Sequence, residues 1–228
     1  MKSSAVRHIL RWLWEAHGAP KLDNNIRHYT GVRPRNVTAT REEIDAILDA
    51  ALPGMRLWIL LCSDLAIRSG TASKLNWSNY DPETRTLRFT TKHNARLALP
   101  VTDEIRELIE ACDPHSHVPF VRQLWTKTRP RAARPIGPGF DDGGKMRMHF
   151  QALCRSVGID RRIIPHDLRR TTAVAMLELT GDVRDVQTLL GHRNLQSTLW
   201  YLDHDLRPVK RSSLELIKTH AWRQEHTA

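Results

Sequence analysis

Six side chains in this sequence could together break a phosphodiester bond. His166 and Arg169 are three residues apart, which places both on one face of a helix. Tyr201 follows His192 by nine residues. Two more cations, one near the end of an apolar segment and one in a strand turn, complete the candidate catalytic set of Arg68, Lys92, His166, Arg169, His192 and Tyr201.

These residue types suit attack on a phosphate by a tyrosine. The guanidinium groups of Arg68 and Arg169 can fork onto the non-bridging oxygens, where negative charge grows in the transition state. A free tyrosine has a pKa of about 10, so its proton must be removed, either by His166 or by the field of the cations. Lys92 can protonate the leaving 5′-oxygen, and His192 can hydrogen-bond the phosphate. Fixed cations replace a metal, so we expect no metal ligands and no cofactor.

The same residues lie in motifs that resemble those of a known family. Over about residues 40–210 the chain resembles the catalytic domain of the tyrosine recombinases, or phage-type integrases. The motifs that carry the resemblance are, in chain order, Ala66-Ile67-Arg68 with Leu75-Asn76-Trp77-Ser78, Thr91-Lys92 with Arg96-Leu97-Ala98-Leu99-Pro100, His166-Asp167-Leu168-Arg169, Leu189-Leu190-Gly191-His192, and Tyr201.

The resemblance implies site-specific recombination of double-stranded DNA, such as integration, excision or inversion of a mobile element. The strand would be cut and rejoined through a 3′-phosphotyrosine link on Tyr201. It also implies a homo-oligomer on DNA, a tetrameric synapse in which C-terminal helices are exchanged between subunits. Two alternatives remain open at this point: a truncated remnant that binds DNA without recombining it, and an enzyme similar to type IB topoisomerases.

Composition limits the class of protein independently. The 228 residues carry 35 Lys and Arg against 25 Asp and Glu, a formal charge of +10 that favours a polyanionic partner. Hydrophobic residues make up 40%, enough for a packed core. The longest apolar run, Leu57 to Cys62, is far shorter than the roughly 18 residues of a membrane span. We therefore expect a cytoplasmic protein that does not enter membranes.

Part of the positive charge is concentrated in residues 122–147. We predict that its side chains contact DNA phosphates, which would position the protein without selecting a sequence. The candidates for DNA binding in this segment are Arg122, Lys127, Arg129, Arg131, Arg134, Lys145 and Arg147. Arg170, which directly follows the His-x-x-Arg motif, is added to them.

Apolar spacing and capping residues predict a mainly α fold with a small antiparallel β-sheet. Residues 84–91 and 96–99 alternate like paired strands, and residues 113–144, rich in Pro, Gly and Arg, are predicted to form a long surface loop. The predicted helices are 5–17, one that starts at Thr40 and is closed by Pro53-Gly54, about 55–67, one capped by Thr102, 145–157, 167–180, 183–190, 196–203 and one after Pro208.

Two regions are expected along the chain. Residues 1–38 are predicted to be a helix and linker, the remnant of an N-terminal DNA-binding (core-binding) domain. Residues 39–228 are predicted to be the catalytic domain with a C-terminal packing helix.

Overall fold

The computed structural model describes residues 12–18, 36–91, 94–128 and 144–202. The chain divides into two units, residues 1–35 and 36–228. In the first unit, residues 12–17 are helical, and the rings of Trp12 and His17 meet edge to face at 4.4 Å. The rest of the predicted helix 5–17, and the predicted helix after Pro208, lie outside the described residues.

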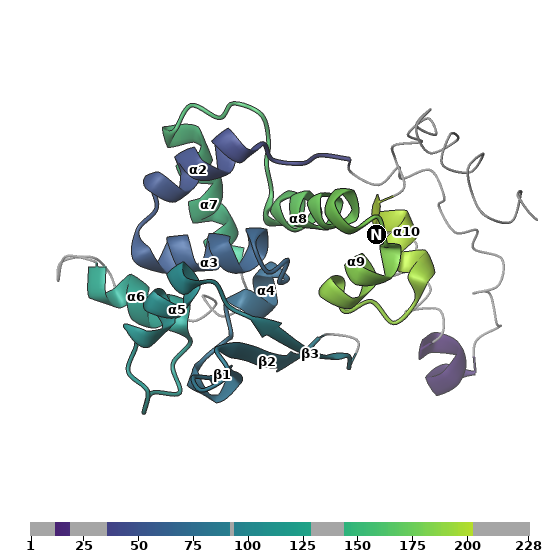
Figure 1. Cartoon of the computed structure of the whole chain (residues 1–228). Helices are drawn as coiled ribbons and strands as arrows, with labels where there is room; N and C mark the ends of the chain where they lie inside the picture. The colour runs from purple at the N-terminus through teal and green to yellow at the C-terminus, as the bar shows by residue number, and fades with distance from the viewer. Residues whose placement is uncertain (1–11, 19–35, 92–93, 129–143, 203–228) are drawn as a thin grey trace, which may run out of the picture. The chain divides into compact units, whose positions relative to one another are not determined.

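The second unit is mainly helical with one small antiparallel sheet, as the sequence predicts (Figure 1). Its helices are α2 (Arg41–Asp49), α3 (Pro53–Ser63), α4 (Ser69–Ala72), α5 (Asp103–Glu110), α6 (Phe120–Thr128), α7 (Gly144–Ser156), α8 (Pro165–Thr180), α9 (Val183–Leu190) and α10 (Leu195–Leu202), with a short 3-10 turn, η2 (Trp77–Asn79).

The sheet has three antiparallel strands in the order β1 (Tyr80–Asp81), β2 (Thr86–Thr90) and β3 (Arg96–Pro100). Leu87 pairs with both Tyr80 and Leu99, and all three side chains are buried on the core side. The sequence predicted β2 and β3 but not β1, because two residues are too few to show an alternating pattern.

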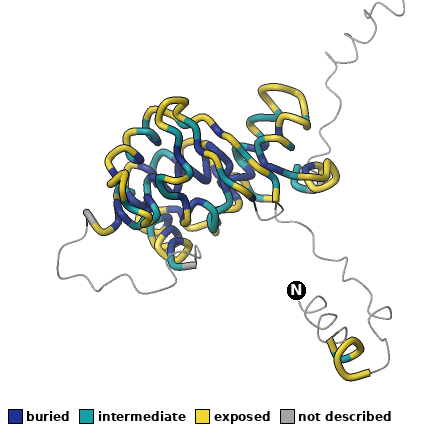
Figure 2. The backbone as a smooth tube through the Cα atoms, turned by 90° about the horizontal axis from the view of Figure 1, so that it is seen from below, coloured by how far each residue is buried: buried dark blue, intermediate teal, exposed yellow. Residues whose placement is uncertain are grey.

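A continuous apolar core lies around α3, which is almost entirely buried. Buried residues gather in the interior of the second unit (Figure 2). The close approach of α3 and α6 depends on Gly54, since a Cβ there would lie 2.7 Å from the carbonyl oxygen of Val121. A second cluster comprising Ala66, Ala173, Val186 and Leu190 joins α8 to α9 beside the loop that carries Arg68. Helix α8 thus packs against both α3 and α9.

Local capping signals in the sequence are confirmed. Thr40 accepts a hydrogen bond from the Glu43 amide, and Glu43 accepts one from Thr40, which completes a capping box at α2. Thr102 caps α5 in the same way through the Ile105 amide. Gly181 and Gly191 end α8 and α9 with positive φ of 72° and 60°, a conformation that favours glycine.

Three helix predictions are wrong. Residues 120–128 form α6 inside the predicted loop 113–144, because Phe120, Val121, Leu124 and Trp125 share one face that packs on α3. Pro53 and Gly54 begin α3 instead of closing the helix before it, since proline is well suited to the first helical position. Helix α3 also ends at Ser63, four residues before the predicted end at 67.

Candidate active site

Arg68 lies at a sharp bend between two helices. The backbone at Ala66 has a positive φ of 50°, and Arg68 then occupies the N-cap position of α4 in extended conformation. This bend turns the Arg68 side chain into a cleft. The side chain is half-buried, and burial lowers the pKa of its guanidinium.

His166 and Arg169 project from the first turns of α8. The helix begins at Pro165, and the buried carboxylate of Asp167 accepts a hydrogen bond from the Ile164 amide at 2.9 Å, which fixes the start of the helix. His166 is exposed to solvent. Partial desolvation by the atoms around the imidazole, with the charge of Arg169 in second place, lowers its pKa below the ordinary 6.5. His166 is therefore neutral at pH 7 and able to accept a proton.

Arg169 links three parts of the chain. Its guanidinium is only 3% exposed and donates to the carbonyl oxygens of Ala66 and, at 2.7 Å, Leu190. Burial, followed by repulsion from Arg68, lowers its pKa to about 10, so the group keeps its charge at neutral pH. The two carbonyls hold the cation in one orientation, while its Nε has no partner among the described residues.

A glycine places His192 against the sheet. Gly191 has left-handed backbone, and a Cβ there would lie 2.9 Å from the Leu97 side chain on β3. The absence of a side chain lets the end of α9 approach the hairpin closely. His192 follows directly, and its Nδ1 lies 3.1 Å from the Thr198 hydroxyl on α10.

Tyr201, on the last turn of α10, lies between the two histidines. Its ring meets the His166 ring edge to face at 4.9 Å and the His192 ring at 6.0 Å. Its hydroxyl donates to the backbone carbonyl of His166 at 3.1 Å. Burial raises the pKa of Tyr201 to about 12, although the nearby guanidiniums of Arg169 and Arg170 act in the opposite direction.

The structure therefore brings five of the six predicted catalytic residues together: Arg68, His166, Arg169, His192 and Tyr201. The sixth, Lys92, lies outside the described residues, so its placement stays a prediction. Its neighbour Asn94 lines a hollow of about 580 Å³ together with Arg68, His192 and Tyr201.

A larger cleft of about 760 Å³ adjoins this hollow at Arg68. Arg68, His166 and Arg169 line it, and none of its lining residues is acidic. The sequence reasoning missed Lys74, an exposed cation that lines the same cleft, six residues after Arg68. Its only sequence signal is that it follows Arg68 within the same motif. A cleft with three cations and no carboxylate suits a polyanion such as the DNA backbone.

The predicted DNA-binding residues are not all described. Arg147 is exposed on α7, whereas Arg122 and Lys145 are partly buried, each with a polar or ring contact of its own. Residues Arg129, Arg131 and Arg134 lie outside the described residues, as does the side chain of Lys127. Arg170 is only 3% exposed, with its guanidinium bonded to Tyr201 and Asn36, so its position argues against the predicted DNA contact.

Neither metal nor membrane features appear in the described part of the chain. No group of three or more His, Cys, Asp or Glu side chains there is arranged to hold a metal ion. Within the same residues, no helix is both long enough and apolar enough to cross a membrane.

Comparison with known proteins assigns the family. Residues 38–207 match the model of the phage integrase family, and the chain belongs to that family. Over 168 residues it is 29% identical to Tyrosine recombinase XerC 1 of Ralstonia nicotianae, a match that covers 68% of this chain and 46% of that relative. The chain thus spans less than half the length of this curated relative.

Solved structures of recombinases share the fold. The XerA recombinase structure superposes with a TM-score of 0.57 at 16% identity, covering 99% of this chain and 83% of that one. A lambda integrase dimer bound to a COC′ core site superposes with a TM-score of 0.63 at 17% identity, covering 91% and 61%.

Proposed function

We propose that this protein is a tyrosine site-specific recombinase that cuts and rejoins double-stranded DNA. The observation that carries the proposal is the gathering of Arg68, His166, Arg169 and His192 around Tyr201, from four separate segments of the chain. Family membership and the shared fold support the same reaction.

Each residue then has one task. The Tyr201 oxygen attacks phosphorus, the bond from phosphorus to the 5′-oxygen breaks, and the 3′ end stays linked to Tyr201. The phenolic proton passes to His166, whose lowered pKa keeps it neutral and able to accept. Arg68 and Arg169 neutralise the phosphate oxygens. Attack by the 5′-hydroxyl of a second strand reverses these steps and restores the tyrosine.

Two further parts of the proposal rest on the family resemblance. Lys92 protonates the leaving 5′-oxygen, and His192 hydrogen-bonds the phosphate. On DNA, copies of the chain assemble into a tetrameric synapse through C-terminal helix exchange; a lambda integrase tetramer bound to a Holliday junction is a related assembly. No cofactor takes part, and the protein acts in the cytoplasm.

The decisive experiment uses a suicide DNA substrate, whose nick lets the 5′ end diffuse away and traps the covalent intermediate. The wild-type chain should form an adduct that survives a denaturing gel, and Tyr201→Phe should form none. Arg169→Ala should lower the rate of adduct formation by about 10²–10³-fold, the usual loss for one donor to a developing oxyanion.

The two alternative functions, a DNA-binding remnant and a topoisomerase-like enzyme, predict different results in this experiment. Tight, salt-sensitive DNA binding without any adduct would support a DNA-binding remnant and overturn the proposal. Relaxation of supercoiled plasmid without site preference would indicate an enzyme similar to type IB topoisomerases. An adduct formed by Tyr201→Phe would assign the nucleophile to another residue.

A further inference from the structure

Arg170 is a buried cation that the proposed reaction does not use. It follows Arg169 on α8 but lines a different hollow, of about 420 Å³, together with Asn36 and Thr38. Its side chain is as deeply buried as that of Arg169. Burial of a guanidinium is costly unless hydrogen bonds compensate, so the acceptors that it contacts are informative.

One acceptor belongs to the nucleophile itself. Arg170 Nη1 donates to the backbone carbonyl of Tyr201. This carbonyl is one of the last of α10, and the last carbonyls of a helix accept no hydrogen bond from within it. A cation at a helix C-terminus also interacts favourably with the helix dipole. The guanidinium carbon lies 5.9 Å from the centre of the Tyr201 ring. Arg170 thus contacts the backbone of the residue whose hydroxyl must be aimed at phosphorus.

The other acceptor is at the boundary of the unit. Arg170 Nη2 donates to Oδ1 of Asn36, the first residue of the second unit. Arg170 Nε has no partner among the described residues, so these two acceptors are its main anchors.

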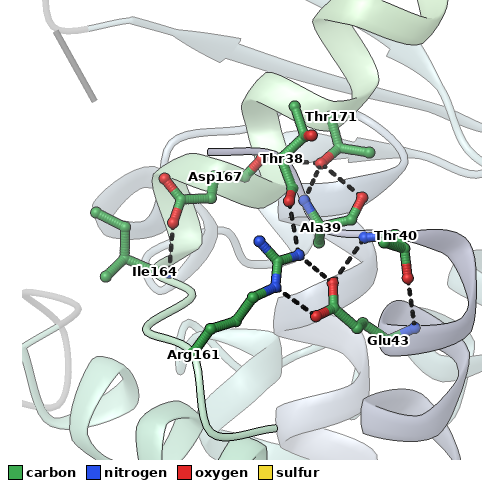
Figure 3. A network of polar contacts seen from close by, with 8 residues as sticks. All are labelled: Thr38, Ala39, Thr40, Glu43, Arg161, Ile164, Asp167 and Thr171. Carbon is green, nitrogen blue, oxygen red and sulfur yellow. Dashed lines mark hydrogen bonds and ion pairs between the residues drawn. The ribbon is translucent and has the colours of Figure 1, made fainter. Parts of the chain in front are cut away.

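The segment after Asn36 is held firmly against the catalytic unit (Figure 3). Arg161 donates to the carbonyl of Thr38 at 2.8 Å and pairs with Glu43. The Ala39 amide donates to the hydroxyl of Thr171 on α8 at 2.8 Å. These contacts fix residues 38–43 on the catalytic unit, and Asn36, two residues before them, bonds Arg170 directly.

We propose that Arg170 is a positioning residue that couples Asn36, where the chain enters the catalytic unit, to the placement of Tyr201. The same guanidinium bonds both Asn36 and the Tyr201 carbonyl. Loss of the Asn36 bond therefore lets Arg170 shift and weakens its bond to the Tyr201 backbone. The inference rests on the proposed function only in taking Tyr201 as the nucleophile.

The test compares variants at the two ends of this connection in the full chain. Asn36→Ala removes the acceptor, Asn36→Asp restores an acceptor oxygen, and Arg170→Lys keeps the charge but loses the planar fork. Thr38→Ala is the matched control, since this exposed side chain lies two residues from Asn36 and, among the described residues, only the Thr38 backbone carbonyl is bonded.

At saturating suicide DNA, Asn36→Ala should form the covalent adduct about five- to tenfold more slowly, the scale of one ordinary intramolecular hydrogen bond, with an unchanged Kd for DNA. Asn36→Asp should recover most of the rate, and Thr38→Ala should match the wild type. In the Arg170→Lys background, Asn36→Ala should cause no further loss. Unchanged adduct formation in Asn36→Ala, or independent effects of the two substitutions, would overturn the inference.

A second readout does not depend on activity. The chain has three tyrosines, so fluorotyrosine labelling gives a simple ¹⁹F spectrum in which Tyr201→Phe identifies the Tyr201 signal. Asn36→Ala should shift the Tyr201 signal and leave that of Tyr80 in place. A fixed Tyr201 signal would overturn the positioning role even if the chain cleaves DNA. A shifted signal without any adduct would support the coupling and count against the proposed function.

Discussion

At the level of single residues, the site keeps Tyr201, the proposed nucleophile, in its protonated form. The Tyr201 hydroxyl is bonded to the His166 carbonyl, and burial raises its pKa to about 12. The neighbouring imidazole has its pKa lowered by partial desolvation and by Arg169. The two shifts leave Tyr201 with its proton and His166 without one at neutral pH.

The His166 shift predicts how stability depends on pH. A histidine whose pKa is lowered in the folded state takes up its proton more readily when unfolded. Its contribution to the free energy of unfolding is therefore complete above pH 6.5 and is lost as the pH falls through the folded pKa. Urea unfolding above and well below pH 6.5 should show a smaller acid-induced loss for His166→Asn than for the wild type. Equal acid-induced losses in His166→Asn and the wild type would contradict the prediction.

Lys74 predicts a change in the salt dependence of DNA binding. If this cleft cation neutralises one phosphate, Lys74→Gln should reduce the slope of the logarithm of the DNA-binding constant against the logarithm of the salt concentration by about 0.9. Binding to all DNA sequences should weaken to the same extent. Fluorescence anisotropy over a salt series measures the slope. Arg155→Gln, an equal loss of charge on α7 outside the described clefts, should leave the slope unchanged. Equal slopes for wild type and Lys74→Gln would remove Lys74 from the DNA interface.

At the level of elements, close helix contacts keep the site residues in register. Helix α3 is the centre of the core, and the bend that carries Arg68 follows directly from its end. Helix α8 packs against both α3 and α9. Arg169 can therefore bond the carbonyl of Ala66, just before α4, and that of Leu190, at the end of α9. Movement of α3 would therefore displace both arginines relative to Tyr201.

The α3–α6 contact gives a stability prediction. In Gly54→Ala the new Cβ would meet backbone atoms of Val121 and Trp125, which cannot swing aside as a side chain can. We expect a loss of about 1–3 kcal/mol in the free energy of unfolding. Gly158→Ala is the comparison: its φ of 79° is strained for alanine, but its Cβ would enter open space. A smaller loss of unfolding free energy for Gly54→Ala than for Gly158→Ala in urea unfolding would contradict this prediction. It would show that α3 and α6 can move apart at little cost in stability.

At the level of the whole molecule, the second unit has a core of its own. The main apolar cluster runs from Ala39 to Leu168, and the second cluster lies entirely beyond residue 65. No described contact that supports the site requires a residue before Asn36. Stability of the catalytic unit is therefore expected to be independent of the first 35 residues.

A shortened chain that begins at Asn36 tests this independence. It should unfold cooperatively in urea with a free energy within about 0.5 kcal/mol of the full chain, since the deletion removes no contact from the core that the structure describes. Circular dichroism follows the transition. A much lower midpoint or loss of cooperativity would mean that residues 1–35 pack against the catalytic unit.

Sequence by itself was enough for the features that depend on local chemistry. Capping at Thr40 and Thr102, helix ends at Gly181 and Gly191, and the order of the family motifs all depend on residues within a few positions of one another. The same spacing identified five residues that the fold brings together. The helix 120–128 was missed because a segment rich in Pro, Gly and Arg follows it, although its apolar face was present.

Only the tertiary structure decided which partners each cation meets. Arg169 and Arg170 are adjacent and chemically identical, yet one borders the cleft that Arg68 and His166 also line and the other connects Asn36 to Tyr201. Their side chains leave the helix about 100° apart, and the acceptors that each meets lie 31 to 134 residues away in Arg170 and 21 to 103 in Arg169. Separations of that size are bridged by packing of α8 against distant elements, and no local pattern in the chain encodes them.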